Sequence, residues 1–561
     1  MLTSVEQRIQ TWLDGPYDPE TKAEIRRLLS VDPKGLSDAF FKDLSFGTGG
    51  MRGVMGIGPN RMNIYTVRMA TQGLARCIQR APEAEHRVFI GYDVRRHSRE
   101  FAEETAKVLS GNGIRPLLSK EVCPTPLVSF ACRHYGCTAA VMITASHNPP
   151  QYNGYKVYWS DGGQIVPPHD REIMAEVQNI KSPDQVQIGT LYEEIGPEID
   201  ALYLAALKKL QMLPALAKIP LEIIYTNLHG TGIRLIPKAL KEWGYTHLRF
   251  VEKQLPLDGN FSSAPSPNPE EEKALKMGLE QLHQEGGDLL IATDPDADRI
   301  GVADPKTRFT GNQIACLCLH HICETLTEKG EFPQNGACIK TIVTTELFRK
   351  IGESFGAKCM DVLTGFKYIG AYIGLWEKAF DGYQYLFGAE ESYGYLFGTF
   401  VRDKDAISAA CLIAEAAAKA KSEGFTLTDR LAQIYRRYGI YRESLTNLVF
   451  SDSQTGMDQM NALMKNLRRS PPLQMDGKPV VVFEDYLLGK GNLPPSDALR
   501  FWLADDTKIV IRPSGTEPKV KIYTEIVEKK TNDIQSADLR LKQMTEAFLK
   551  EFIYTAATPK A

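Results

Sequence analysis

Short runs of β-branched and aliphatic residues alternate with longer amphipathic segments over most of the chain. Residues 87–93 (RVFIGYD) are expected to form a strand, and residues 98–113 (SREFAEETAKVLSGNG) a helix with Ser98 as its N-cap. Residues 138–146 (TAAVMITAS) are the next expected strand and lead into a polar loop. This alternation is typical of parallel sheets with crossover helices, so most of the chain is predicted to be α/β.

The same pattern starts again twice further along the chain. It restarts at residues 221–230 (LEIIYTNLHG), continues through a helix that Asn268 is expected to cap, and reaches residues 288–299 (DLLIATDPDADR). It restarts near Gly311 and reaches a strand at 383–392 (YQYLFGAEES). Each unit places polar residues at the C-terminal end of a strand, which predicts three similar domains with mixed α/β sheets.

The pattern changes past Tyr441, where strand-like runs dominate. Residues 499–513 (LRFWLADDTKIVIRP) and 519–528 (KVKIYTEIVE) predict a smaller α+β domain with antiparallel strands. We expect the four domains to surround a central cleft, with a hinge at residues 438–443. The expected domain boundaries are 1–205, 206–314, 315–438 and 439–561.

Length, charge and composition exclude several classes of protein. A chain of 561 residues is long enough for several cores. The 66 Lys and Arg nearly balance the 69 Asp and Glu, for a net charge of -3, which disfavours nucleic acid and anionic membranes as partners. The most apolar helical stretch, residues 406–418, is too short to span a bilayer, which takes about 20 residues. It is expected to be a buried helix.

The N-terminus and the cysteines indicate a cytoplasmic protein. Residues 1–15 lack the basic start and apolar core of a signal peptide. Ten cysteines include no C-x-x-C pair, which disfavours both a zinc ribbon and a disulfide framework. Cys132, His134 and Cys137 lie close together in the sequence, but ordinary packed thiols explain them better than a metal site does.

The loop at residues 144–156 (TASHNPPQYNGYK) places Ser146 and His147 where α/β enzymes carry reactive groups. A serine at this place is a candidate covalent acceptor of a phosphoryl or acyl group. The structural alternative is a turn built by Asn148 and Pro149, with Ser146 binding a backbone group. Ser146 does not stand in a G-x-S-x-G motif, which disfavours a serine hydrolase.

A second motif, D-P-D-A-D-R, presents Asp294, Asp296 and Asp298 directly after a buried strand. Three carboxylates at alternate positions of an extended loop can converge on one hard cation, and a solvated acidic turn is the alternative. The motif lacks the Gly and the distal Glu of an EF-hand, so Mg²⁺ with a phosphate partner is the better interpretation. Arg299 would then balance the phosphate charge.

Two further loops carry polar groups suited to a phosphorylated sugar. Glu390 and Ser392 offer an acceptor and a donor for hydroxyl groups. The loop R-P-S-G-T-E-P-K has the hydroxyls, backbone N–H groups and guanidinium that cradle a phosphate, and a structural turn is the alternative. Its cradle residues are Arg512, Ser514, Gly515 and Thr516.

These four motifs, in this order along nearly the whole chain, resemble the α-D-phosphohexomutase superfamily. The segments GTGGMRGVMGIGPNRMN (47–63), GFKYIG (365–370), EESYGY (390–395) and RDKD (402–405) look most like its longer bacterial phosphoglucomutases and their phosphopentomutase relatives. Shorter family members carry a histidine soon after the sugar-loop serine, whereas this chain has Tyr393 and Gly394, so the role of that histidine is not transferred.

The resemblance implies an isomerase that interconverts α-D-glucose 1-phosphate and glucose 6-phosphate. Ser146 would carry the phosphoryl group, the three aspartates would hold one Mg²⁺ together with a phosphoserine oxygen, and glucose 1,6-bisphosphate would be both intermediate and activator. Arg52, His147 and Lys156 match active-site positions of the first domain. Lys156 and Lys404 are the candidate general acid and base, because a lysine near a metal and other cations has a lowered pKa.

Several alternatives share these motifs. A phosphomannomutase, a phosphopentomutase or a glucose 1,6-bisphosphate synthase would use the same parts, and a non-catalytic sugar-phosphate sensor would keep the fold. The expected partners are small phosphosugars, with the chain a monomer or a weak homodimer.

Overall fold

The computed structural model describes residues 4–44, 46–47, 50–83, 85–451, 454–491, 493–514, 518–529 and 533–557. The chain divides into two compact units. The first unit comprises Met1–Cys338 with Gly365–Leu427, and the second comprises Ile339–Thr364 with Thr428–Ala561.

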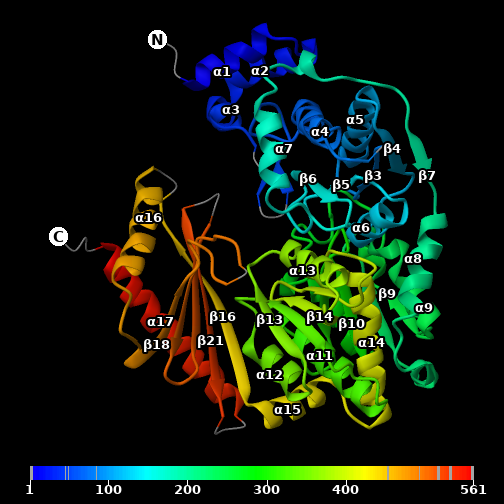
Figure 1. Ribbon diagram of the computed structural model, residues 1–561, viewed down its shortest axis with the longest axis vertical. Helices are drawn as coiled ribbons and strands as arrows, with labels where there is room; N and C mark the ends of the chain where they lie inside the picture. The colour runs from blue at the N-terminus through cyan, green and yellow to red at the C-terminus, as the bar shows by residue number, and fades with distance from the viewer. Residues whose placement is uncertain are drawn as a thin grey trace. The chain divides into compact units, whose positions relative to one another are not determined.

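Three helices at the N-terminus form a small cluster of their own, α1 (Ser4–Asp14), α2 (Pro19–Val31) and α3 (Pro33–Phe41) (Figure 1). Asp18 caps α2 by accepting a hydrogen bond from the Thr21 N–H at 2.6 Å, and Asp32 caps α3 in the same way. Trp12 packs edge-on against Phe40 and against Tyr65 of the first domain. This aromatic contact fixes the cluster to the first domain.

The first domain is built on a seven-stranded mixed sheet in the order β1-β2-β6-β5-β3-β4-β7. β3, β4 and β5 are parallel, and β5 pairs antiparallel with β6. The helices α4 and α5 cover one face and α6 the other (Figure 1). The strands are β1 (Phe46–Gly47), β2 (Gly50–Val54), β3 (Arg87–Tyr92), β4 (Arg115–Ser119), β5 (Ala139–Ile143), β6 (Tyr152–Trp159) and β7 (Glu193–Ile195), and the helices are α4 (Ile64–Ile78), α5 (Ser98–Gly111), α6 (Thr125–His134), α7 (His169–Gln178), η1 (Pro183–Gln185) and α8 (Glu198–Lys208).

The second domain has a four-stranded sheet in the order β11-β10-β8-β9, in which only β11 is antiparallel. Its α10 begins at Glu272 with Glu271 as N-cap, so the expected cap at Asn268 is wrong. The Asn268 side chain instead accepts a hydrogen bond from the Glu270 N–H in a turn. The elements are η2 (Pro214–Lys218), β8 (Ile223–Thr226), η3 (Thr231–Arg234), α9 (Ile236–Trp243), β9 (Leu248–Phe250), η4 (Glu252–Gln254), α10 (Glu272–Gln284), β10 (Leu289–Thr293) and β11 (Ile300–Ala303).

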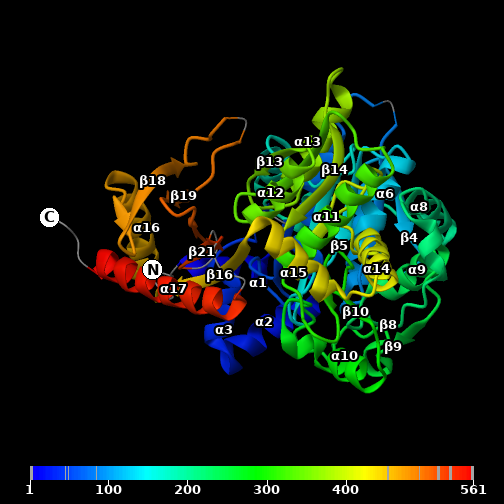
Figure 2. The same cartoon turned by 90° about the horizontal axis from the view of Figure 1, so that it is seen from below.

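The third domain contributes another four-stranded sheet, in which β14 pairs antiparallel with β15. Its α14 is the buried helix that the sequence predicted, and it packs between α11 and α9 (Figure 2). The elements are α11 (Gly311–Glu328), β12 (Gly336–Thr341), α12 (Glu346–Ser354), β13 (Lys358–Val362), α13 (Lys367–Lys378), β14 (Gln384–Glu390), β15 (Gly394–Leu396), α14 (Ala406–Ser422) and α15 (Leu427–Tyr438).

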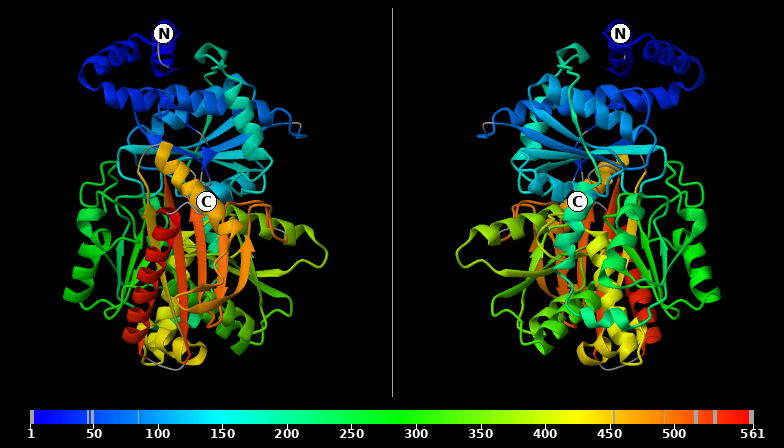
Figure 3. Two further views of the ribbon diagram at one scale, coloured as in Figure 1. Left: turned by 90° about the vertical axis from the view of Figure 1, so that its left-hand side faces the viewer. Right: turned by 90° about the vertical axis from the view of Figure 1, so that its right-hand side faces the viewer.

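The C-terminal domain has a six-stranded antiparallel sheet in the order β16-β21-β20-β19-β18-β17. The helices α16 and α17 share one apolar core with this sheet (Figure 3). The elements are β16 (Ile440–Val449), α16 (Gln454–Arg469), β17 (Gln474–Met475), β18 (Lys478–Asp485), β19 (Leu499–Leu503), β20 (Lys508–Pro513), β21 (Lys519–Glu528) and α17 (Ile534–Ala557).

Three mixed α/β sheets followed by an antiparallel α+β domain confirm the predicted fold class. The residues expected to act as a hinge, 438–443, lie inside the second unit. Gly439 has φ of 97°, a backbone conformation that glycine adopts readily.

Candidate functional site

Ser146 lies just beyond β5 and is 1% exposed. Its φ is 52°, an uncommon value for a residue with a side chain, and its N–H donates to the Thr144 hydroxyl at 2.9 Å. Its Oγ lies 2.8 Å from Asp294 Oδ2 and 3.2 Å from His147 Nδ1. The loop therefore turns the serine hydroxyl toward a carboxylate of the second domain.

Arg95 holds this serine loop in place, and the sequence analysis missed it. Its guanidinium lies against the Asp93 carboxylate at 3.2 Å, and both side chains are fully buried. Four carbonyl oxygens of the loop accept hydrogen bonds from it, at 2.5 to 3.0 Å, those of Ser146, Asn148, Pro149 and Tyr152. The signal in the sequence was an Asp and an Arg directly after the β3 strand.

Asp294, Asp296 and Asp298 converge after β10, as the sequence predicted. Each is at most 1% exposed, and one ligand oxygen from each lies within 4.8 Å of the others. The N–H groups of Asp298 and Arg299 donate to Asp294 Oδ1 at 3.1 and 3.0 Å, which closes the loop on itself. Among the described residues this is the only group of three or more such side chains able to hold a metal ion.

Two buried lysines bind the same carboxylates. Lys156 Nζ lies 2.8 Å from Asp296 Oδ2 and 3.0 Å from Asp298 Oδ2, and Lys404 Nζ lies 3.1 Å from Asp298 Oδ2. Burial acts to lower the pKa of each lysine, but the carboxylates outweigh it and raise both pKa values above the ordinary range. Among the protein's own groups, carboxylates and not cations are the nearest charges to both lysines.

The carboxylates keep free oxygens that point to a cation site. Asp296 Oδ1 and Asp298 Oδ1 are buried and have no hydrogen-bond partner among the described residues, although the other oxygen of each accepts from lysine. Burial, followed by the neighbouring charges of Asp296 and Asp298, raises the pKa of Asp294 well above its usual range. Three buried carboxylates, two of which have an oxygen without a hydrogen-bond partner, fit a hard divalent cation.

Two arginines act electrostatically on His147, the residue that follows the serine. Arg52 lies on β2, in register with Gly154 of β6, and its Nε is buried with no hydrogen-bond partner among the described residues. Arg299 pairs with Glu270, and its Nε lies 3.9 Å from Asp298 Oδ1. Burial, followed by the charges of Arg299 and Arg52, holds the pKa of His147 well below its usual range. A neutral histidine in the electrostatic field of two arginines is suited to an anion beside Ser146.

The loop that carries the three aspartates, residues 294–299, is called the metal loop. The third loop, which follows β14, contacts it directly. Glu390 ends β14, is 7% exposed and accepts the Gly365 N–H at 2.8 Å, and burial raises its pKa. Ser392 lies in the turn that follows and is half-buried. Tyr393 has φ of 63°, and its carbonyl accepts the Ile300 N–H at 3.2 Å. The sugar-loop candidates thus belong to the same unit as the serine and the aspartates.

The expected phosphate cradle belongs to the second unit. Arg512 lies on β20, directly opposite Lys521 of β21, and the Ser514 N–H donates to the Lys519 carbonyl at 2.8 Å. Gly515 and Thr516 are outside the described residues.

Comparison with known proteins decides the family. Four models for the phosphoglucomutase/phosphomannomutase domains match in order, domain I at residues 43–184, domain II at 201–308, domain III at 310–438 and the C-terminal domain at 445–540. A phosphoglucomutase of Staphylococcus haemolyticus (strain JCSC1435) is 37% identical over 505 residues, which cover 86% of this chain and 90% of its own. The chain belongs to the phosphoglucomutase/phosphomannomutase family. A phosphoglucomutase of Staphylococcus aureus (strain USA300) is 35% identical over 540 residues, or 92% of this chain and 95% of its own.

Solved structures agree on the fold of this family member. A putative phosphomannomutase from Thermus thermophilus is 24% identical with a TM-score of 0.69, over 91% of this chain and 99% of its own. The open form of pp63/parafusin from Paramecium is 18% identical with a TM-score of 0.69, over 91% of this chain and 96% of its own. At these identities the likeness concerns the fold alone.

Asp403, in the RDKD segment of this family member, is a second site residue that the sequence analysis did not assign. Its Oδ2 accepts from the Tyr158 hydroxyl at 2.8 Å and from Gln164 Nε2 at 2.6 Å, and its Oδ1 accepts the Lys404 N–H. It holds Lys404 in place against the metal loop. The sequence shows an aspartate in this motif, but it does not show that the aspartate contacts β6.

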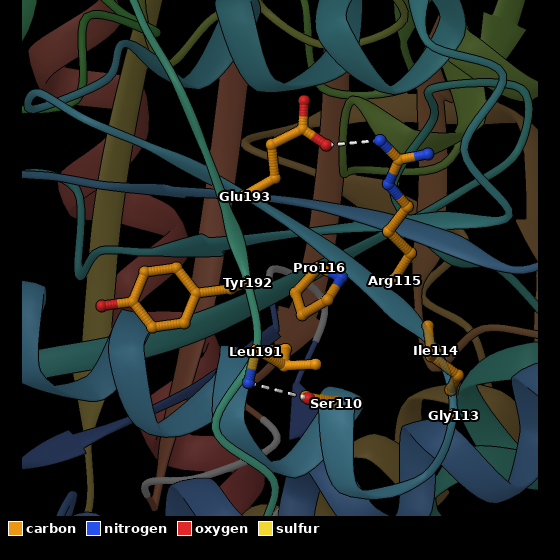
Figure 4. Close-up of a pocket in the computed structure, with 8 residues that line it drawn as sticks. All are labelled: Ser110, Gly113, Ile114, Arg115, Pro116, Leu191, Tyr192 and Glu193. Atoms are coloured by element: carbon orange, nitrogen blue, oxygen red, sulfur yellow. Dashed lines mark hydrogen bonds and ion pairs between the residues drawn. The ribbon is translucent and has the colours of Figure 1, made fainter.

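Other features of this family member carry no chemistry of this kind. Cys132 donates to the carbonyls of Cys137 and Trp159, as a packed thiol does, and no helix among the described residues is long and apolar enough to cross a bilayer. A shallow pocket of about 360 Å³ lies beside β4 and β7, where Arg115 pairs with Glu193 (Figure 4). None of the predicted site residues lines it.

Proposed function

We propose that this protein is a phosphoglucomutase that interconverts α-D-glucose 1-phosphate and glucose 6-phosphate. The observation that carries the proposal is the position of Ser146 Oγ, 2.8 Å from a carboxylate of the buried aspartate triad and next to His147, whose pKa the charges of Arg299 and Arg52 help to lower. A hydroxyl beside buried carboxylates that can hold a cation is suited to carry a phosphoryl group. Relatives named phosphoglucomutase support glucose as the sugar.

In this proposal Ser146 is phosphorylated in the resting enzyme. The free 6-hydroxyl of glucose 1-phosphate gives up its proton as its oxygen attacks the phosphorus atom. The new O–P bond forms as the Ser146 Oγ–P bond breaks, Ser146 Oγ takes up a proton, and glucose 1,6-bisphosphate results. The bisphosphate turns, Ser146 Oγ attacks the 1-phosphoryl group, and glucose 6-phosphate leaves. Arg52 and Arg299 hold the phosphoryl group in transfer, and His147 contacts the serine oxygen.

Asp294, Asp296 and Asp298, with an oxygen on Ser146, would hold one Mg²⁺ per chain. The buried, unpartnered oxygens Asp296 Oδ1 and Asp298 Oδ1 support this ligand set. When bound, the ion would offset negative charge on the phosphoryl group in transfer. Lys156 and Lys404 occupy the other oxygens, so we propose that they balance the charge of the triad, and they stay the candidate general acid and base.

The remaining site residues are proposed to hold the sugar phosphate. Glu390 and Ser392 would bind sugar hydroxyls. Arg512, Ser514, Gly515 and Thr516 would cradle the phosphate that does not react, because a guanidinium, hydroxyls and backbone N–H groups suit a phosphate.

The cell compartment and assembly are part of the same proposal. All ten cysteines are free thiols, which supports a reducing cytoplasm. We further propose a monomer or weak homodimer with domain boundaries near residues 205, 314 and 438.

The decisive experiment compares kcat/KM for the 1-phosphates of α-glucose, α-mannose and α-ribose, with Mg²⁺ and a trace of the matching bisphosphate. A clear preference for glucose is expected. A preference for mannose or ribose would keep the mechanism and change the substrate. No turnover of any of the three, together with no phosphoryl adduct by intact mass after incubation with glucose 1,6-bisphosphate, would favour a sugar-phosphate sensor.

A further inference from the structure

The metal loop is held by hydrogen bonds from three different domains of the first unit. Three consecutive carbonyls of the loop each accept a backbone N–H, at 2.7 to 3.2 Å. The pairs are Pro295 with Thr231 of the second domain, Asp296 with Thr125 of the first domain, and Ala297 with Ala406 of the third domain. Of these three donors, Thr125 also reaches a ligand side chain.

The Thr125 hydroxyl donates to Asp296 Oδ2 at 2.8 Å, and the same oxygen accepts from Lys156 Nζ at 2.8 Å. The other oxygen, Asp296 Oδ1, is buried and has no hydrogen-bond partner among the described residues. Both Thr125 and Asp296 are 0% exposed. Two donors on one oxygen fix the rotation of the carboxylate and leave the other oxygen for a cation.

Helix capping does not account for this hydroxyl. Thr125 is the first residue of α6, the N-cap is Pro124, and no side chain caps the helix. The hydrogen bond from the Thr125 N–H to the Asp296 carbonyl already holds the loop in place. The additional effect of the Thr125 hydroxyl is therefore to orient the Asp296 carboxylate.

We infer that Thr125 is a positioning residue that aims Asp296 Oδ1 at the divalent cation. The inference rests on the metal site of the proposed function. Hydrogen bonds from outside a ligand set keep a ligand in its binding orientation, and their loss weakens metal binding by roughly 10- to 100-fold. Thr125 would therefore act on cation affinity from the first domain without touching the cation.

The test is Mn²⁺ affinity measured by electron paramagnetic resonance on Thr125→Val and Thr125→Ser, with phosphoryl occupancy matched by intact mass. Valine keeps the shape and the backbone bond but removes the hydroxyl. We expect binding roughly 10-fold weaker in Thr125→Val, with binding close to wild type in Thr125→Ser. The control is Thr105→Val, which removes another fully buried hydroxyl that bonds within α5, and it should bind Mn²⁺ as wild type does.

Asp296→Asn separates this inference from the proposed function. Normal Mn²⁺ binding by Asp296→Asn would contradict the proposed metal site itself. Loss of binding in Asp296→Asn, with unchanged binding in a folded Thr125→Val, would overturn the role of Thr125 alone. If Thr125→Val does not fold, Thr125→Cys takes its place, because a thiol is a weak donor of similar size, and binding equal to wild type would again contradict the inference.

Discussion

Ser146 Oγ lies 2.8 Å from Asp294 Oδ2, although the two residues are 148 positions apart in the chain. One follows β5 of the first domain, and the other follows β10 of the second domain. Each loop ends a strand of a different sheet, and both contain a residue with a side chain at positive φ, Ser146 and Ala297. The reactive hydroxyl and the carboxylates therefore meet only when the two domains are packed together.

Ser146→Ala should abolish the mutase reaction and leave the fold intact. The variant loses the only atom proposed to carry the phosphoryl group, so kcat should fall by on the order of 10³-fold or more. Intact mass after incubation with glucose 1,6-bisphosphate should show no phosphoryl adduct on the variant and one on wild type. Full activity in pure Ser146→Ala would exclude the phosphoserine mechanism.

Lys156→Met should lower stability in a way that a divalent cation partly repairs. Lys156 is 1% exposed and contacts two carboxylates, and removing one partner of a buried ion pair costs about 3 to 5 kcal/mol. Thermal unfolding in EDTA should show this loss, and Mg²⁺ should restore more stability to the variant than to wild type.

Lys404→Met is the matched comparison, because Lys404 contacts only Asp298 among the three aspartates. It should lose less stability than Lys156→Met. If each variant loses as much stability in Mg²⁺ as it loses in EDTA, the result would argue against charge balance as the role of these lysines.

Arg95→Met should damage the serine loop, and Arg96→Met should not. Arg95 is buried and binds four loop carbonyls, whereas Arg96 is exposed and binds Asn260. Urea unfolding should show a loss of about 3 to 5 kcal/mol for Arg95→Met and less than about 1 kcal/mol for Arg96→Met. If the two variants unfold at the same urea concentration, the guanidinium does not hold the loop.

A buried charge network in the second unit should make stability depend on pH. Glu525 accepts the Glu346 N–H at 2.9 Å, and Lys508 Nζ lies 2.9 Å from Glu346 Oε1. Burial is the main cause that raises the pKa of Glu525 from 4.5 to about 7, with Lys508 and Lys340 opposing and Glu346 and Glu443 adding to the shift.

Between pH 4.5 and 7 the folded chain holds a proton on Glu525 that the unfolded chain has lost, so folding is favoured less as pH rises through this range. Glu525→Gln removes this loss because an amide does not ionise. As pH rises from about 5 to about 8, the free energy of unfolding of the variant should increase by about 1 to 3 kcal/mol relative to that of wild type. Urea unfolding at several pH values measures the difference, and parallel curves would contradict it.

The pattern of hydrophobic residues predicted the elements well wherever a strand is buried on both faces. β5 and β10 are such strands, and the polar loops that follow them carry Ser146 and the aspartates. Capping was predicted less well, since Asn268 forms a turn and α10 begins at Glu272. A single Asn suits a turn and a cap equally, and only the packing of the following helix decides between them.

The sequence by itself determined the four motifs, their order and the types of side chain in each, because residue types and strand ends are local properties. Tertiary structure decided which groups meet. The positions of Arg95 under the serine loop, of Thr125 on Asp296 and of both lysines on Asp298 each join residues far apart in the chain. The pKa of Lys404 rises and does not fall because the nearest charge in space is a carboxylate from another domain, and no spacing along the chain records that distance.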